Sequence, residues 1–332
     1  MKGKKWARRI AVSFFCVIVF LFLSAVIVFS VVGGVGERSL YRVGRERAAQ
    51  LTDISRGGKT YRYNEDILSF LVMGIDTFDK VKPAEDGISG GQSDTLLLLV
   101  LDPKKKELTV VGINRDTITD IDVYDPQGFF LGTFKAQITL QHGYGDGMEQ
   151  SCERSVKAVS KLFHNLPIHG YCAFNMGALP ILNDAVGGVT VTVPEDLPAI
   201  NFREGEVRFL QNMDVYWYLR ARDITSFDSA GRRLERQKQY LAAFFPTAKR
   251  AIKKDISLLF RMYEQLKQYM VTDVDVSEMV YLAGAALSLD IEEIRFVSLP
   301  GTTVMGESFE EFYLDEEAFT DLLLELFYEE AE

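Results

Sequence analysis

The chain has 332 residues, of which 47% are hydrophobic and 25% are charged, and its formal net charge at pH 7 is −10. These fractions are ordinary for a globular protein, and the length leaves room for one large domain or two small ones. The acidic balance argues against nucleic acid as a partner, because proteins that bind nucleic acid usually carry a basic domain.

The N-terminus predicts a membrane anchor. Residues 1–9 contain five Lys or Arg, and residues 10–32 contain no charged residue. A stretch of about 20 apolar residues suffices to span the hydrocarbon core, and the basic flank favours a cytoplasmic N-terminus. A cleaved signal peptide is the alternative, although its apolar region would be shorter. We therefore expect a short cytoplasmic tail at 1–9, one transmembrane helix at 10–32 and an extracellular domain held at the cell membrane.

The folded domain is expected to begin after a juxtamembrane linker at 33–65, where Arg, Glu and Gly mix with little apolar periodicity. Apolar runs then predict buried strands at Ile67–Ile75, Thr95–Leu101 and Leu108–Ile113, and the turn residues at 102–107 predict a hairpin between the last two. Further along, helices and strands alternate, with strands expected at 171–174, 189–193 and 294–299 and helices at 148–164, 176–185, 212–222, 232–250, 255–270, 276–288 and 315–330. This interleaving predicts one α/β domain at 66–332, with a central mixed sheet flanked by helices in an α-β-α-like arrangement.

Several kinds of site are not supported by the sequence. Cys152 and Cys172 permit either a disulfide or two buried free thiols, and no Cys/His cluster predicts structural zinc. The loop Gly143–Gly147 lacks the Lys-Ser/Thr of a P-loop, and no Gly-x-Ser-x-Gly motif is present. Neither a nucleotide-binding P-loop nor a serine hydrolase is therefore expected.

Polar residues flank the first three predicted strands. Asp76 ends the first strand, Asp94 starts the second and Arg115 ends the third. If neighbouring strands pair as antiparallel hairpins, these three side chains meet at one edge of the sheet. Two carboxylates and a guanidinium at one rim can bind a hard divalent cation and an anionic ligand, although charged strand ends are also common where a chain meets water.

An arginine cluster supplies further candidates for anion binding. Residues 220–236 hold five arginines, whereas residues 296–332 contain eleven Asp or Glu and no Lys or Arg. Arg233, Arg236 and Gln237 share one helical face, while Arg220 and Arg222, two apart, would need a helix end or a loop to act together. Planar guanidinium groups match phosphate geometry, and a solvated basic face paired with Glu235 or Asp223 is the alternative.

Taken in order, these motifs resemble the LytR–CpsA–Psr family of wall-polymer ligases. The resemblance covers roughly residues 66–332 behind the predicted anchor. It rests on Gly-Ile-Asp76, Ser-Asp94-Thr, Arg115-Asp-Thr, Asn183-Asp-Ala-Val-Gly-Gly-Val189 followed by Thr-Val-Pro-Glu-Asp, Arg220-x-Arg222, and Arg233-Leu-Glu-Arg236-Gln237.

The resemblance implies transfer of a phosphate-linked glycopolymer, such as teichoic acid or capsule, from a polyprenyl pyrophosphate carrier to peptidoglycan. It implies that Asp76 and Asp94 bind Mg²⁺ and that Gln237 is a polar pocket residue. It further implies an apolar tunnel for the lipid tail and muramic acid hydroxyls as acceptors. Asp94 is the better candidate to take the acceptor proton, and Arg115 shares the catalytic role. The pyrophosphate is implied to bind Arg115, Arg220, Arg222, Arg233 and Arg236.

Two positions depart from the family pattern. Many relatives have Arg where this chain has Gln92, and many have Lys where the best ungapped match places Gln137. Both changes remove a positive charge from the expected pocket, and Lys135 or Arg232 are the candidates to replace it. An altered substrate or a weakened activity would also accommodate these changes.

Three other functions compete with the transferase interpretation. A hydrolase would cleave the lipid pyrophosphate with water as acceptor, and a non-catalytic receptor would bind wall precursors without turnover. A transcription regulator fits poorly, because the large domain is expected outside the cell, the chain is acidic and no convincing helix-turn-helix is present. The sequence does not identify the polymer, the acceptor, the lipid length or the oligomeric state.

Overall fold

A computed structural model describes residues 31–86, 89–221, 227–289 and 294–331. Its centre is a six-stranded sheet in the order β11–β8–β3–β4–β5–β12. Strands β3–β4–β5 are antiparallel neighbours, whereas β8 runs parallel to β3 and β12 parallel to β5, so the sheet is mixed as expected. The strands are β3 (Leu68–Ile75), β4 (Ser93–Asp102), β5 (Glu107–Ile113), β8 (Gly170–Asn175), β11 (Met270–Thr272) and β12 (Arg295–Ser298).

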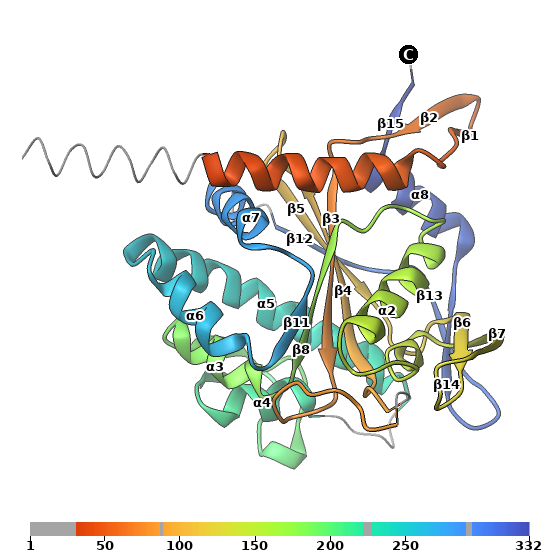
Figure 1. The fold of residues 1–332 in the computed structure, drawn as a ribbon. Helices are drawn as coiled ribbons and strands as arrows, with labels where there is room; N and C mark the ends of the chain where they lie inside the picture. Colours follow the sequence, from red (N-terminus) through yellow and green to blue (C-terminus); the bar gives the residue numbers. More distant parts are fainter. Residues whose placement is uncertain (1–30, 87–88, 222–226, 290–293, 332) are drawn as a thin grey trace, which may run out of the picture.

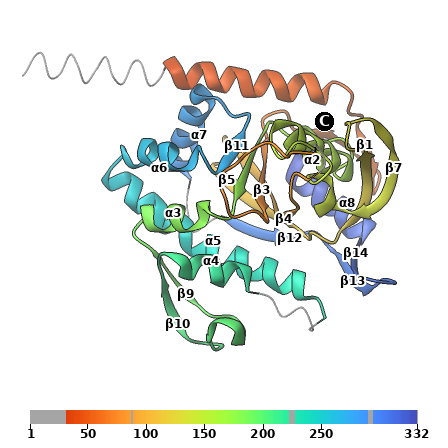
Figure 2. The ribbon, with the colours of Figure 1, turned by 60° about the horizontal axis from the view of Figure 1, so that its bottom comes forward.

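Helices cover both faces of this sheet (Figures 1 and 2). Along β3, Leu71, Met73 and Ile75 belong to the core shared with α2 and α8, while Val72 packs with the residues beneath α5. This alternation follows from the period of two in a strand, and uninterrupted apolar runs are typical of strands buried on both faces. The helices are α2 (Glu149–Leu162), α3 (Ala178–Ala185), α4 (Met213–Arg220), α5 (Ser229–Lys254), α6 (Leu258–Leu266), α7 (Val276–Ser288) and α8 (Glu316–Phe327).

Smaller sheets surround the central layer. β1 (Ile54–Arg56), β2 (Lys59–Tyr63) and β15 (Tyr328–Glu330) form one of them. The other three are two-stranded: β6 (Ile118–Tyr124) with β7 (Phe130–Gln137), β9 (Val189–Thr192) with β10 (Val207–Leu210), and β13 (Gly301–Met305) with β14 (Glu310–Leu314). Two short 3-10 helices, η1 (Ile138–Gln141) and η2 (Pro198–Ile200), complete the described elements.

The segment predicted as a juxtamembrane linker is folded instead. Residues 31–48 form a helix that lies across one end of the central sheet, and β1 and β2 follow it (Figure 1). Leu40 is completely buried against Leu68 and Phe70, which anchors this helix to the start of β3. The prediction was wrong here because one apolar anchor and several glycines give no strong helical period.

Two further expectations concern the membrane span and the cysteines. Residues 10–30 of the predicted span, including Cys16, lie outside the described residues, and among the described helices none is long and apolar enough to cross a membrane. Cys152 and Cys172 are free thiols, so the disulfide alternative is not what the structure shows. Burial raises the pKa of Cys172 to about 12, which keeps this thiol protonated and unreactive at neutral pH.

Candidate functional site

The three polar strand ends converge as the hairpin argument predicted. Ile75 of β3 lies opposite Ser93 of β4, and Leu96 of β4 lies opposite Ile113 of β5. This register places Asp76, Asp94 and Arg115 at one edge of the sheet. Strand pairing alone therefore assembles two carboxylates and a guanidinium from segments separated by up to 39 residues along the chain.

Asp94 is held between two arginines. One carboxylate oxygen pairs with Arg115, and the other accepts a hydrogen bond of 3.1 Å from Arg233, which also donates to the Asp94 carbonyl at 3.1 Å. The side chains of Arg115, Asp94 and Arg233 are only 14%, 12% and 6% exposed. These contacts hold both guanidinium groups in place at the sheet edge. Removal of one partner would leave a buried charge uncompensated.

Gln92 joins this triad to Asp76. Its side-chain oxygen accepts a hydrogen bond of 2.7 Å from Arg115, and its backbone N–H donates to the Asp76 carboxylate at 2.8 Å. The Asp76 N–H donates in return to the Gln92 carbonyl at 3.0 Å. The sequence analysis treated Gln92 only as a lost positive charge and missed this positioning role. Its place two residues before Asp94, at the same predicted rim, was the available signal.

The remaining arginines occupy different environments. Arg220 ends α4, donates to the Tyr216 hydroxyl and makes no ion pair within the described part of the chain, so its charge is available to an anion. Arg236 is 2% exposed, and its donors reach Glu195 and the carbonyls of Tyr218 and Ala221. Burial lowers the pKa of Arg236, and Glu195 opposes this effect. Arg236 therefore links α5 to the C-terminal end of α4 through hydrogen bonds. Arg222 lies outside the described residues.

An apolar cavity of about 280 Å³ opens beside the triad, between β3, β4, β8 and helices α3, α4 and α5. Arg220, Arg233 and Gln237 are among its lining residues, and Gln237 donates a 2.9 Å hydrogen bond to Thr95. The other lining residues are Val72, Met73, Gly74, Thr95, Leu97, Phe174, Asn175, Met176, Leu179, Leu182, Leu219, Tyr240, Leu241 and Phe244. One cavity thus combines a long apolar wall with two guanidinium groups.

Gln137 and the two candidates to replace the missing positive charges, Lys135 and Arg232, all bind other residues. Gln137 donates to Asp116 at 3.0 Å and to the Glu310 carbonyl at 2.8 Å. Lys135 is 69% exposed and pairs with Asp120 at 2.9 Å, while Arg232 pairs with Glu195 at 3.2 Å. Neither Lys135 nor Arg232 supplies the charge that Arg at 92 or Lys at 137 would add.

Asp76 and Asp94 at the rim could bind one metal ion only if a phosphate or water supplied further oxygen ligands. Within the described residues, no group of three or more His, Cys, Asp or Glu is arranged to hold a metal. Magnesium, however, usually binds one or two carboxylates together with phosphate oxygens and waters. Asp76 is exposed and uses one oxygen for the Gln92 N–H, so its donor chemistry fits such a shared site.

Known proteins resemble this chain in sequence. The sequence model of the LytR_cpsA_psr family matches residues 38–326. The polyisoprenyl-teichoic acid–peptidoglycan teichoic acid transferase TagU of Enterococcus faecalis is 31% identical over 193 residues, which are 57% of this chain and 54% of that relative. The corresponding transferase TagV of Bacillus subtilis is 26% identical over 303 residues, covering 87% of this chain and 72% of TagV.

The fold is shared with solved structures as well. The crystal structure of B. subtilis TagV superposes with a TM-score of 0.60 at 22% identity, covering 79% of this chain and 97% of TagV. The family match extends into the helix at 31–48, which agrees with its being part of the fold. The chain belongs to the LytR_cpsA_psr family.

Proposed function

We propose that this protein is a membrane-anchored phosphotransferase that moves a glycopolymer from polyprenyl pyrophosphate to peptidoglycan outside the cell. The observation that carries the proposal is the cavity whose apolar wall leads to Arg220, Arg233 and the paired Asp94. A polyprenyl pyrophosphate matches this cavity, because its apolar chain would contact the apolar wall and its anionic head would contact the arginines. The names of the TagU and TagV relatives support the same donor and acceptor.

The proposed reaction is a displacement at phosphorus. The acceptor hydroxyl oxygen forms a bond to the phosphorus that carries the glycan, and the bond from that phosphorus to the lipid phosphate oxygen breaks. The products are a glycan phosphodiester on peptidoglycan and polyprenyl phosphate. Catalysis of phosphoryl transfer depends mainly on positioning and charge stabilisation, which guanidinium groups held in place can provide.

Each residue at the rim has a proposed role. Arg115, Arg220 and Arg233 bind the pyrophosphate, and Gln92 keeps Arg115 oriented. Donor binding is expected to draw Arg115 and Arg233 toward the phosphate oxygens, which frees the Asp94 carboxylate oxygens to accept the hydroxyl proton. Asp76 and Asp94 would hold Mg²⁺, which would supply additional positive charge next to the pyrophosphate.

The experiment uses the full chain in detergent with a labelled polyprenyl-pyrophosphoryl glycan, Mg²⁺ and a peptidoglycan oligomer. We expect label on the peptidoglycan, with about a hundredfold less transfer by Asp94→Asn, since a general base typically contributes 10²–10⁴-fold. The matched control is Asp120→Asn, which removes an exposed carboxylate outside the cavity. Label released without acceptor would instead indicate a hydrolase, and binding without turnover would indicate a receptor.

A further inference from the structure

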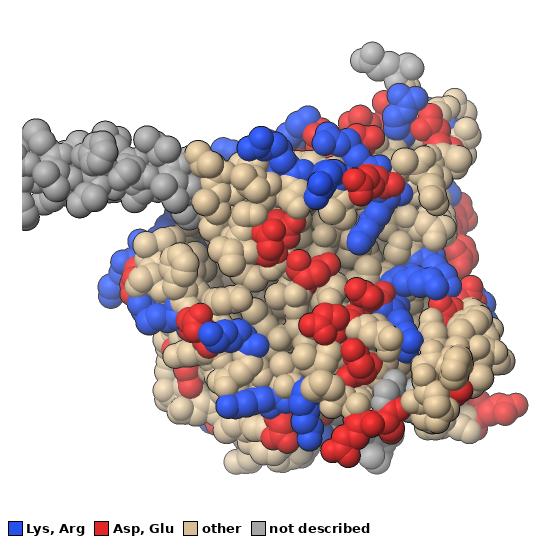
Figure 3. All heavy atoms as spheres, in the orientation of Figure 1, with Lys and Arg blue, Asp and Glu red and all other residues tan. Residues whose placement is uncertain are grey.

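The end of α5 and the start of α6 form a surface that combines cations with exposed apolar side chains. Arg250, Lys253 and Lys254 lie in the last turns of α5 and are exposed, and none of the three makes an ion pair within the described part of the chain. Ile256 and Phe260 follow with exposed fractions of 53% and 67%. Figure 3 shows Lys and Arg gathered near this end of α5 and over α6, at the left edge of the molecule. We call these five residues the α5–α6 surface.

Local structure accounts for only part of this surface. Cations near the C-terminus of a helix are stabilised by the helix dipole, which explains the two lysines that end α5. The helix α6 buries Leu258 and Leu266 against the domain, whereas Ile256 and Phe260 stay in water, where apolar surface is unfavourable. Exposed apolar side chains bordered by cations are typical of surfaces that lie in the headgroup region of a membrane.

The helix at 31–48 shows which side of the molecule this surface faces. A Cβ added at Gly36 would overlap the Ser277 carbonyl at the start of α7, and one added at Gly33 would lie 3.6 Å from the Val280 side chain. The two helices therefore run in opposite directions, and the end of α7 lies near the start of the helix at 31–48.

The end of α5 lies on this same side. Lys249 donates to the carbonyl of Leu289, which directly follows α7. Figures 1 and 2 show from two directions that the ends of α5 and α7 lie on the side where the described chain begins, at Val31. The uncharged run that predicts the anchor, residues 10–32, ends at this point of the sequence. An anchor that enters the bilayer here brings the α5–α6 surface to the membrane.

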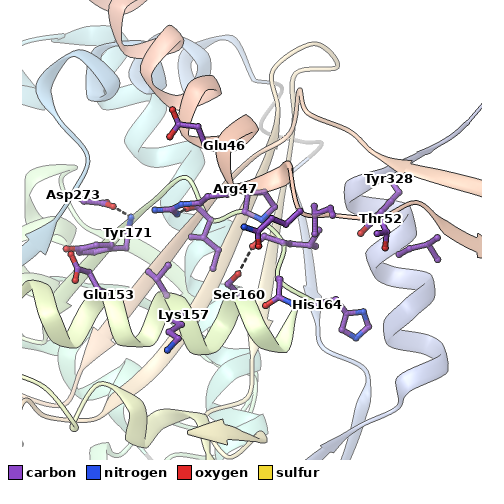
Figure 4. A pocket seen from close by; sticks show the side chains of 18 residues that line it. Glu46, Arg47, Thr52, Glu153, Lys157, Ser160, His164, Tyr171, Asp273 and Tyr328 are labelled. Carbon is purple, nitrogen blue, oxygen red and sulfur yellow. Dashed lines mark hydrogen bonds between the residues drawn. The ribbon is translucent and has the colours of Figure 1, made fainter. Parts of the chain in front are cut away.

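The opposite end of the helix at 31–48 carries the reverse charge. A cavity of about 920 Å³ lies there, and Glu46, Glu153 and Asp273 are among the residues that line it (Figure 4). The helix is about 27 Å long at 1.5 Å per residue, which separates this cavity from the start of the described chain. Carboxylates repel anionic lipid headgroups, so the distribution of charge favours the same orientation as the exposed apolar side chains.

The helix α5 connects this surface to the catalytic rim. Near its start Arg233 pairs with Asp94, and further along Leu241 and Phe244 line the apolar cavity. The order along α5 is therefore rim, apolar wall and α5–α6 surface. Phe244 and Lys254 are about 15 Å apart at 1.5 Å per helical residue. A lipid tail that arrives from the side of the α5–α6 surface thus meets the apolar wall before the arginines.

We propose that the α5–α6 surface docks on the outer face of a membrane that contains anionic phospholipid. Ile256 and Phe260 enter the boundary between headgroups and acyl chains, and Arg250, Lys253 and Lys254 contact the lipid phosphates. Docking turns the apolar wall of the cavity toward the bilayer, so that a polyprenyl tail passes along α5 to the rim. This inference rests on the membrane anchor of the proposed function.

The test places the full chain in nanodiscs made of equal parts of phosphatidylglycerol and phosphatidylcholine. The fluorophore NBD is attached to Phe260→Cys in a Cys16→Ala background, and burial raises the pKa of Cys152 and Cys172, so these thiols stay unlabelled. We expect lipid that carries a nitroxide near its headgroup to quench this fluorophore at least about twofold more than one at Phe134→Cys. Phe134 is the matched control, because it is 56% exposed on β7, away from the start of the described chain.

The contribution of the cations is measured with the same fluorophore. Lys254→Gln should lower the ratio of docked to undocked protein about fivefold, the effect expected of one lysine near an anionic surface. Lys135→Gln, which removes an exposed cation on β7, should leave this ratio unchanged. Nanodiscs of phosphatidylcholine alone should lower it further, because all three cations of the surface then lose their anionic partners.

Equal quenching at positions 260 and 134 would overturn the docking proposal, and equal quenching with and without phosphatidylglycerol would overturn the role of anionic lipid. Failure of the full chain to enter nanodiscs would also overturn the proposal, because the anchor would then be absent. Ile256→Cys provides the same readout if Phe260→Cys does not fold. Glycan transfer in the same nanodiscs separates this result from the proposed function. Transfer without quenching at position 260 contradicts the docking alone, and quenching without transfer contradicts the transferase alone.

Discussion

At the scale of single residues, the site is organised by hydrogen bonds that the strand ends make with one another. Asp94 is paired with Arg115 and Arg233, and Gln92 bonds to both Arg115 and Asp76. A glutamine in this place removes one positive charge but adds an acceptor that fixes a guanidinium. We therefore regard Gln92 as a positioning residue and not as a vacant cation site.

Substitution of Gln92 tests this role. Gln92→Ala removes the acceptor of a 2.7 Å hydrogen bond to Arg115. We expect kcat for glycan transfer to fall about tenfold, because one hydrogen bond to a charged group contributes roughly 1.5–3 kcal/mol. Gln127→Ala, in the exposed β6–β7 turn, is the control. Steady-state kinetics that show unchanged kcat for Gln92→Ala would assign Gln92 no part in orienting Arg115.

The apolar cavity makes a second prediction at this scale. Leu182 of α3 lines the cavity but belongs to none of the described core clusters, so a larger side chain fills space that a lipid would use. Leu182→Trp should raise KM for a long polyprenyl donor on the order of tenfold, given about 0.8 kcal/mol for each CH₂ that loses its contact. A donor with a short prenyl chain should show little change. Equal effects on both donors would argue against a lipid in this cavity.

At the scale of elements, the helix at 31–48 packs through its glycines. A Cβ at Gly36 would overlap the Ser277 carbonyl at the start of α7, and one at Gly44 would overlap the His169 ring. Close approach of backbones at glycine leaves no apolar period in the sequence, which is why residues 33–65 resembled a linker. By contrast, β3, β4 and β5 could be predicted because strands buried on both faces are continuously apolar.

Two glycine substitutions on this helix should have opposite effects. A Cβ added at Gly34 would have no atom within 4 Å. Gly34→Ala should therefore stabilise the protein by about 0.5–1 kcal/mol, because alanine has the higher helix propensity. Gly36→Ala should destabilise it by about 1–3 kcal/mol, because backbone at α7 must move. Urea unfolding of the two variants measures the difference. Stabilisation by both substitutions would show that the helix is not packed against α7.

The same comparison explains how much of the site could be predicted. Asp76, Asp94 and Arg115 were expected together because strand register follows from hairpin connectivity. Arg233 and Arg236 were expected on one face, but a helical face does not show which arginine reaches the cavity. The partner of Arg236, Glu195, comes from a loop whose position depends on tertiary packing. Spacing therefore found the candidates, and only the fold separated Arg233 from Arg236.

At the scale of the whole molecule, a buried histidine couples folding to pH. His169 is 5% exposed and accepts a hydrogen bond of 3.0 Å from the Ser69 N–H through Nδ1. Burial, together with the charge of Arg47, lowers its pKa from 6.5 to about 4. Protonation then favours the unfolded chain. The stabilisation is complete above the unfolded pKa and is lost as pH falls through the window from about 6.5 to about 4.

Unfolding free energies measured between pH 7 and pH 4 should fall by up to roughly 3 kcal/mol from this one group. His169→Asn retains an acceptor for the Ser69 N–H but does not titrate, so its stability should depend less steeply on pH. Some slope should remain, because burial also lowers the pKa of His142. Identical slopes for the variant and the unmodified protein would exclude His169 as the source.

The whole molecule brings an apolar cavity and an arginine-rich rim into one domain. The central claim is that the rim transfers a glycan phosphate and not a glycan alone. Phosphorus NMR and mass spectrometry of the product formed by the full chain test this claim most directly. The account predicts a phosphodiester on peptidoglycan and one equivalent of polyprenyl phosphate. A phosphate-free glycosidic linkage with release of polyprenyl pyrophosphate would contradict it.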